Sequence, residues 1–164
     1  MDAVKKKKAW IRLIAKVDGI LLAGILLWLF IGEIRIVHNR DMEPSLKDGD
    51  LCVTYKASSY YPGDIVLYRF EGVWRFGRVA ASEGDVVEIR EDGYYTVNGI
   101  VPYETGTMKT YPAAGSAVGY PYTVKEGEVF VLNDAREEGN DSRLFAGVSD
   151  LHGKVVLVIR RRGF

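Results

Sequence analysis

The hydrophobic and polar positions of this 164-residue chain divide it into two regions of different character. An uncharged apolar run spans residues 19–32, and a lysine-rich segment over residues 5–16 precedes it. From about residue 51 onward, the apolar residues instead form short runs that are separated by turn-forming residues. This change of pattern predicts an N-terminal helix followed by a β-rich domain, with the boundary near His38.

The apolar run has the features of a membrane anchor. It is shorter than the ~20 apolar residues that usually span a bilayer, so we expect basic side chains before it and apolar ones after it to extend the span. A cleaved signal peptide shows the same order of basic and apolar regions, but no small-residue cleavage site follows Gly32. A row of four lysines disfavours a buried core helix. We therefore predict a cytoplasmic N-terminus over residues 1–16, an anchor over 17–37 and an extracellular domain over 38–164.

Several stretches after the anchor predict β-strands. They are rich in β-branched and aromatic residues and are bounded by turn signals such as Pro62-Gly63-Asp64 and Asn98-Gly99. The predicted strands are 51–55, 65–70, 73–79, 86–90, 94–97, 129–132 and 154–159. Residues 101–121 show no clear period and predict an irregular or mobile loop. The predicted fold class is mainly β, a partly open barrel or coiled sheets that one N-terminal transmembrane helix precedes.

Composition and charge narrow the choice of partners. Lysine plus arginine and aspartate plus glutamate are equal at 22 each, which argues against a nucleic-acid partner. Cys52 is the single cysteine, so no intramolecular disulfide can form, and we predict a buried, unreactive thiol. His38 and His152 are too few for a metal site and there is no Cys/His cluster, so neither a metal nor a cofactor is expected.

Four blocks of sequence occur in an order that is characteristic of one protease family. The blocks are Met42-Glu43-Pro44-Ser45-Leu46 with Gly49-Asp50, Gly63-Asp64-Ile65-Val66, Arg78-Val79 with Gly84-Asp85, and Asn133 to Arg143 with Asp134, Asp141, Ser142 and Arg143. Together with the anchor, they resemble the type I signal peptidases. Members of that family are serine–lysine membrane proteases that cut signal peptides on the outer face of the membrane. The resemblance covers nearly the whole chain from the anchor onward and implies a signal-peptidase-like β domain.

The resemblance places three residues at the family's catalytic positions, and each differs from the family's residue. Asp41 stands at the position of the nucleophilic serine, Gly77 at that of the general-base lysine, and Gly139 at that of the serine that orients the lysine. The family's mechanism needs a neutral lysine that accepts the proton of the serine. In a comparable serine protease, loss of the nucleophile or its base lowers turnover by on the order of 10⁶. We therefore expect no catalytic residue and predict that the chain is not an enzyme.

Two other routes to hydrolysis are disfavoured by the residues present. An aspartic-protease arrangement needs a second unpaired carboxylate beside Asp41, whereas the resemblance assigns the other candidate aspartates to ion pairs. Ser45 is a poor substitute nucleophile, because the matching family residue is a scaffold hydroxyl and no lysine or histidine lies at a suitable spacing.

The resemblance also implies a peptide cleft and a framework that supports it. In the family, the substrate adds as a β-strand between the segment that leads to the nucleophile and the strand that leads to the lysine. Asp41 would either face a cation of the bound segment or pair with a neighbouring arginine. The predicted cleft residues are Ile36, His38, Asn39, Asp41, Met42, Trp74, Phe76 and Gly77. The predicted framework is Pro44, Ser45, Arg78, Asp134, Asp141 and Arg143, in which Arg78 and Arg143 are the partners of the two aspartates.

Aspartate at position 41 with glycine at position 77 resembles the SipA-type proteins that are encoded with pilins and sortases in Gram-positive pilus clusters. This resemblance implies a non-catalytic, membrane-anchored accessory of pilus assembly. Its partners would be pilin subunits, a pilin-polymerising sortase and membrane lipid. Two alternatives stay open: a general secretion helper that binds signal peptides or an active signal peptidase, and a peptidase with an atypical mechanism.

Overall fold

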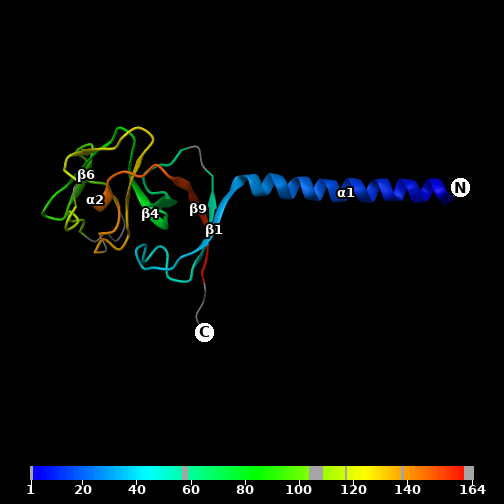
Figure 1. Cartoon of the computed structure of the whole chain (residues 1–164), viewed down its shortest axis with the longest axis horizontal. Coiled ribbons are helices and arrows are strands. Elements are labelled where there is room, and N and C mark those ends of the chain that lie inside the picture. The colour runs from blue at the N-terminus through cyan, green and yellow to red at the C-terminus, as the bar shows by residue number, and fades with distance from the viewer. Residues whose placement is uncertain (1, 57–58, 104–108, 117, 138, 161–164) are drawn as a thin grey trace.

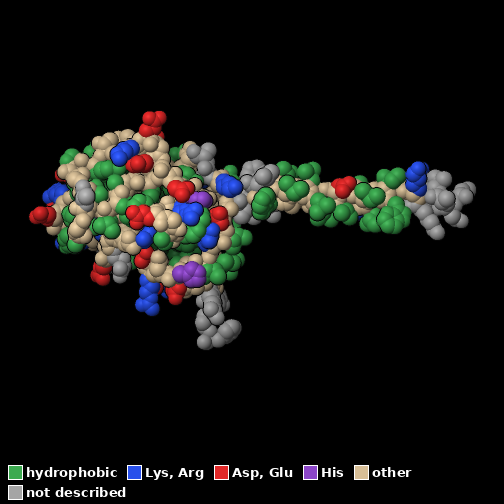
Figure 2. Space-filling view, viewed as in Figure 1, with side chains coloured by type: hydrophobic (Ala, Val, Ile, Leu, Met, Phe, Trp, Pro, Cys, Tyr) green, Lys and Arg blue, Asp and Glu red, His purple; other side chains and the backbone are tan. Residues whose placement is uncertain are grey.

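The structure is a computed structural model that describes residues 2–56, 59–103, 109–116, 118–137 and 139–160. Figure 1 shows one long helix, α1 (Asp2–Phe30), which projects away from a β-rich domain. Its described side chains are exposed, among them Trp10, Ile20 and Trp28. Figure 2 shows that apolar side chains lie along the whole described length of this helix. The helix therefore adds nothing to the core of the domain.

Residues that were expected to end the anchor belong to the domain instead. Helix α1 ends at Phe30, and strand β1 (Ile31–Ile36) follows it and pairs with a neighbouring strand of the larger sheet. Among the described residues, no helix combines the length and the apolar character that crossing a membrane requires. The structure confirms the predicted mainly β class and does not show the predicted transmembrane helix.

The larger sheet contains six antiparallel strands in the order β1-β2-β9-β3-β4-β8. The strands after β1 are β2 (Leu51–Tyr55), β3 (Ile65–Phe70), β4 (Val73–Ser82), β8 (Val129–Leu132) and β9 (Leu151–Ile159). Strand β9 lies between β2 and β3, so the C-terminal strand joins the β1–β2 pair to the β3–β4 hairpin. The β3–β4 turn contains Glu71 and Gly72, both of which have a positive φ.

A smaller sheet of three strands, in the order β6-β5-β7, completes the described β structure. Its strands are β5 (Val86–Ile89), β6 (Tyr95–Val97) and β7 (Tyr122–Thr123). A short helix, α2 (Ser142–Phe145), follows β8, and Asp141 caps its N-terminus by accepting a hydrogen bond from the backbone nitrogen of Arg143.

Apolar side chains pack on both faces of the larger sheet because neighbouring residues of a strand point to opposite faces. One cluster contains Val37, Met42, Leu46, Cys52, Leu67 and Phe76. The cluster on the other face contains Val66, Tyr68, Val79, Val129, Val131 and Val148. A third cluster joins the smaller sheet to β4 and β8 and contains Ala80, Ala81, Val87, Ile89, Tyr95, Val124, Phe130 and Leu132.

The strand predictions agree closely with the structure where a run is bounded by turn residues. The predicted ranges 51–55, 65–70 and 129–132 match β2, β3 and β8 residue for residue, and β4 and β9 are each three residues longer than predicted. Strands β1 and β7 and helix α2 were not predicted. The described parts of residues 101–121 contain no helix or strand, as expected, while residues 104–108 and 117 lie outside the described residues.

Alanine at Gly32 should destabilise the domain, because a Cβ atom there would lie 2.7 Å from the carbonyl oxygen of His152 and 2.7 Å from Thr54 Oγ1. We expect Gly32→Ala to lower the free energy of unfolding by about 1–3 kcal/mol, measured by thermal denaturation of the full chain in detergent. Gly24→Ala is the matched control, because a Cβ atom in that part of α1 meets nothing within 4 Å. Equal melting temperatures for both variants would show that residues 31–36 do not belong to the sheet.

Cys52 should make the stability of the domain depend on alkaline pH. Its side chain is fully buried, and burial, with a smaller effect of Asp50, raises the pKa of the thiol from 9.0 to about 11. The folded chain therefore keeps a neutral thiol while the thiol of the unfolded chain ionises above pH 9. We expect the unfolding free energy to fall between pH 9 and 11, by up to about 1.4 kcal/mol per pH unit. Urea unfolding of Cys52→Ala should show a shallower fall; equal slopes would contradict the expectation.

Candidate functional site

Arg78 on β4 joins three segments that surround the predicted cleft. Its Nε and Nη2 atoms donate to the two carboxylate oxygens of Asp134 at 2.7 and 2.6 Å. Its Nη2 also donates to Ser45 Oγ at 2.9 Å, and its Nη1 donates to the carbonyl oxygen of Gly63 at 2.8 Å. A two-point arginine–carboxylate contact is stronger and more directional than a single hydrogen bond. Arg78 therefore fixes the segment after Asp41, the turn before β3 and the end of β8 relative to one another.

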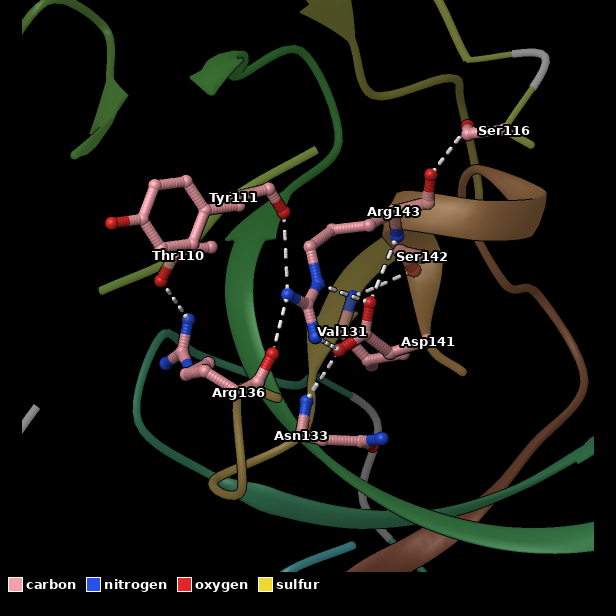
Figure 3. Close-up of polar contacts among 9 residues, drawn as sticks. All are labelled: Thr110, Tyr111, Ser116, Val131, Asn133, Arg136, Asp141, Ser142 and Arg143. Carbon is pink, nitrogen blue, oxygen red and sulfur yellow. Dashed lines mark hydrogen bonds and ion pairs between the residues drawn. The ribbon is translucent and has the colours of Figure 1, made fainter. Parts of the chain in front are cut away.

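The buried Asp141–Arg143 pair holds the segment that follows β8 (Figure 3). Asp141 Oδ1 accepts from Arg143 Nε at 2.9 Å, and Oδ2 accepts from Nη2 at 2.8 Å. The same carboxylate accepts from the backbone nitrogen of Asn133 at 2.9 Å. Arg143 Nη1 donates to the carbonyl oxygens of Arg136 at 2.8 Å and Tyr111 at 3.3 Å. This number of hydrogen bonds offsets the cost of taking two charges out of water.

Asp41 lies between β1 and β2, where Asn39 holds its carboxylate. Asn39 Nδ2 donates to Asp41 Oδ2 at 2.8 Å, and the backbone nitrogen of Asp41 donates to Asn39 Oδ1 at 3.4 Å. The carbonyl oxygen of Asp41 accepts from the backbone nitrogen of Ala135 at 2.9 Å. Because Ala135 follows Asp134, the position that the resemblance assigns to the nucleophile is anchored to the framework. The structure also pairs Asp134 with Arg78 and Asp141 with Arg143, the partners that the resemblance implied.

Gly77 is buried on β4 against side chains of its two neighbouring strands. A Cβ atom at this position would lie 3.1 Å from Tyr68 Cε1 and 3.1 Å from Val131 Cβ. The Tyr68 ring therefore occupies space into which a longer side chain at position 77 would project. Burial raises the pKa of Tyr68; Arg75 lowers it, and Asp141 and Asp41 raise it further. The Tyr68 ring is fully buried and belongs to the apolar cluster that also contains Val79 and Val131.

Gly139 lies in a different part of the site. A Cβ atom there would lie 3.2 Å from the Cβ of Ala113. It lines a cavity of about 520 Å³, between the 111–114 segment and the buried arginines Arg136 and Arg143. The third position that the resemblance assigned to catalysis is therefore packed against the irregular segment before β7.

Strand β4 has an open edge along its first half. Residues Arg78 to Ser82 pair with β8, whereas Val73 to Gly77 pair with β3 alone. Among the described residues, no strand lies on the other side of Val73–Gly77. Backbone groups on such an edge can bind an added strand. The peptide cleft was predicted between this stretch of β4 and the segment that leads to Asp41.

The predicted cleft residues divide between surface and core. Met42 is fully buried and Phe76 is 8% exposed, and both belong to the apolar cluster on the face of β4 opposite to Gly77. Trp74 packs against the same cluster, with the Arg35 guanidinium 4.1 Å from its ring centroid. The exposed members are Ile36, His38 and Asn39.

Sequence reasoning missed Tyr68 and Arg75. Both share the face of Gly77, as the alternation of side chains along β3 and β4 could have shown. The resemblance drew attention only to the family's motif positions, which include neither residue.

Comparison with known proteins identifies the family of this chain. The family model described as "Signal peptidase, peptidase S26" matches residues 8–159. The chain belongs to the signal peptidase S26 family. A signal peptidase I of Bacillus licheniformis is 32% identical over 149 residues, an alignment that covers 82% of this chain and 80% of that protein.

More distant relatives carry the same name. A signal peptidase I of Mycobacterium tuberculosis is 28% identical over 164 residues, which covers 70% of this chain and 55% of the relative. This chain therefore spans about half of the mycobacterial protein. A crystal structure of a signal peptidase I from Enterococcus faecalis superposes with a TM-score of 0.50 at 22% identity and covers 62% of this chain and 100% of that chain. The likeness supports the signal peptidase fold.

Family membership confirms the signal peptidase resemblance and corrects one prediction drawn from it. The prediction that the chain is not an enzyme is contradicted, because the curated relatives that match most of this chain are named signal peptidase I. That prediction rested on Asp41, Gly77 and Gly139. Residue types at three positions that a resemblance assigns do not decide whether a protein is an enzyme.

Asp141→Asn should strongly destabilise the protein, because it leaves Arg143 charged, buried and poorly compensated. We expect a loss of about 3–5 kcal/mol in the free energy of unfolding, measured by urea denaturation. Asp92→Asn is the matched control, since the Arg90–Asp92 pair is 57% and 43% exposed and should contribute less than about 1 kcal/mol. Equal losses in the two variants would show that burial does not set the importance of the Asp141–Arg143 pair.

Proposed function

We propose that this member of the signal peptidase family binds extended peptide segments of exported proteins at the membrane surface, and that it serves there as an accessory of pilus assembly. The observation that carries the proposal is the open edge of β4 at Val73–Gly77. A peptide added at this edge would pair with the backbone groups of Val73–Gly77, which among the described residues have a neighbouring strand on one side only. It would extend the sheet on the side where β8 pairs with the rest of β4.

Hydrogen bonds hold the residues on both sides of the proposed peptide-binding edge. Arg78 ties β4 to Asp134, and the backbone of Ala135 is hydrogen-bonded to Asp41. Binding at an ordered edge costs less conformational entropy than binding that must first order a loop. Main-chain contacts give affinity for many sequences, so the side chains along the edge would supply specificity.

A membrane location is part of the proposal. The chain would have a cytoplasmic N-terminus, a single membrane-associated segment within residues 17–37 and an outer domain, with membrane lipid as a partner. The lysine-rich start of the chain and the exposed apolar side chains of α1 support this arrangement. Such a helix would hold the peptide-binding edge close to the point where exported segments leave the bilayer.

Pilin subunits are the partners that we propose, with a pilin-polymerising sortase as the enzyme that receives them. Asp41 and Gly77, at the positions discussed above, support this choice by resemblance to SipA-type proteins. Deletion of the gene should then reduce pilus polymers, scored as the high-molecular-weight ladder on a gel. Unchanged polymers together with slower signal-peptide processing would instead support a general secretion helper.

Hydrolysis of the bound segment is the second candidate function, because the relatives are named as peptidases. Asp41 is the carboxylate that lies at the position of the family's nucleophile and could accept a proton from an attacking water. A route of this kind would not use a lysine at position 77. Cleavage that disappears in Asp41→Ala but persists in Asn39→Ala would support it.

Binding by strand addition predicts that only alternate backbone amides of a peptide face β4. We expect a pilin-derived octapeptide with N-methyl groups at its odd residues, or else at its even residues, to lose at least tenfold in affinity, while the other pattern binds nearly as well as the parent. Fluorescence anisotropy with the full chain in nanodiscs would measure this, and mass spectrometry of the same samples would detect cleavage. Equal losses for both patterns would argue against strand addition.

A further inference from the structure

Two polar side chains that lie opposite each other on β3 and β4 each contain a buried polar atom with no hydrogen-bond partner among the described residues. The hydroxyl of Tyr68 and the Nε of Arg75 are both buried and make no hydrogen bond. Arg75 also forms no ion pair within the described part of the chain. Its Nε is buried, but the residue as a whole is partly exposed to solvent. Buried polar groups are almost always hydrogen-bonded in native proteins, so two unpartnered donors in one place point to a ligand.

The two side chains lie on one face of the sheet. Tyr68 and Arg75 are directly opposite each other in the β3–β4 register, and Gly77 lies two residues further along β4 on the same face. Arg75 also lowers the pKa of Tyr68 against the larger effect of burial. Because Gly77 has no side chain, Tyr68 and Arg75 are the polar side chains that β3 and β4 place beside it on this face.

Arg75 belongs to the open stretch of β4, Val73–Gly77. A strand added there would place every second side chain on the same face as Arg75, and one of these would lie directly beside it. Among the other charged groups near Tyr68, Asp141 forms an ion pair with Arg143, and Asp41 accepts a hydrogen bond from the neutral amide of Asn39. Arg75 is a cation beside Tyr68 that forms no ion pair within the described part of the chain, so its charge is available to an anionic ligand.

We propose that Arg75, with Tyr68 beneath it, forms a subsite for a carboxylate of the bound peptide, supplied by a glutamate or aspartate side chain. A guanidinium and a phenol hydroxyl are both donors, and arginine binds carboxylates through two parallel hydrogen bonds. Arg75 makes the first contact because Tyr68 is fully enclosed in the free chain. The side chain of Arg75 then turns toward the bound carboxylate. After this movement, the Tyr68 hydroxyl donates to the same carboxylate. This inference rests on the proposed peptide binding and adds its specificity.

The test uses synthetic octapeptides of alanine, valine and threonine with one glutamate moved along the sequence, and the matching glutamine series. Both series are made with a free and with an amidated C-terminus, and affinity for the full chain in nanodiscs is measured by anisotropy. We expect one glutamate position to bind about tenfold more tightly than its glutamine counterpart, whatever the C-terminus. Arg75→Gln should bring that ratio to about one, and Arg75→Lys should restore part of it.

Two control variants, Arg69→Gln and Tyr120→Phe, separate the subsite from general effects on the fold. Arg69→Gln removes an exposed arginine on the opposite face of β3 and should leave the glutamate preference unchanged. Tyr68→Phe should reduce the preference severalfold without lowering the melting temperature, because it removes a buried hydroxyl that has no partner. Tyr120→Phe removes another such hydroxyl, in a tyrosine packed against the third apolar cluster, and should leave the preference unchanged.

The outcomes also separate this inference from the proposed function. Tight binding of glutamate and glutamine peptides alike would overturn the subsite and leave strand addition standing. A preference that vanishes on amidation would overturn the side-chain assignment and place the terminal carboxylate at Arg75. Failure of every peptide to bind would overturn both proposals. A glutamate preference that persists in Arg75→Gln would overturn the subsite, because another residue would then bind the glutamate carboxylate.

Discussion

The buried ion pair between Asp141 and Arg143 is the constraint on which the geometry of the site depends. One carboxylate caps α2, accepts from the end of β8 and binds the guanidinium, which in turn reaches the carbonyl oxygen of Tyr111. Two charges removed from water are tolerated only with this many partners. These contacts hold several described residues of the segment between β8 and α2, and Ala135, whose backbone nitrogen donates to Asp41, lies in the same segment.

Hydrogen bonds connect that segment to β4 and to the residues around the predicted cleft. Asp134 holds Arg78, and Arg78 holds Ser45 and the turn at Gly63. Strand β4 is consequently fixed at its centre, where its pairing with β8 ends and its open edge begins. A sheet edge beside an ordered framework is suited to bind a strand, since the protein need not be ordered at the moment of binding.

The two faces of β4 differ in whether the polar groups of their side chains have hydrogen-bond partners. Trp74 and Phe76 pack into an apolar cluster that also contains Met42, so they contribute stability. The Gly77 face also contains an apolar cluster, to which Tyr68 belongs, but the Tyr68 hydroxyl and the Nε of Arg75 make no hydrogen bond to a described residue. Membership in the signal peptidase family gives the fold and a class of relatives, whereas recognition depends on side chains of this kind, which lie outside the family's motifs.

The sequence by itself determined the mainly β class, the bounds of β2, β3 and β8, and the family, because alternation, turn residues and motif order are local properties. It did not determine where the first helix ends: Ile31, Ile34 and Ile36 follow directly on the apolar run, and only pairing with β2 makes residues 31–36 a strand. Nor did it separate core residues from exposed ones among the predicted cleft residues, since Met42 and Phe76 lie in an apolar cluster while Ile36 and His38 are exposed. That distinction depends on which way each side chain points and on what packs against it, and contacts between distant segments set both.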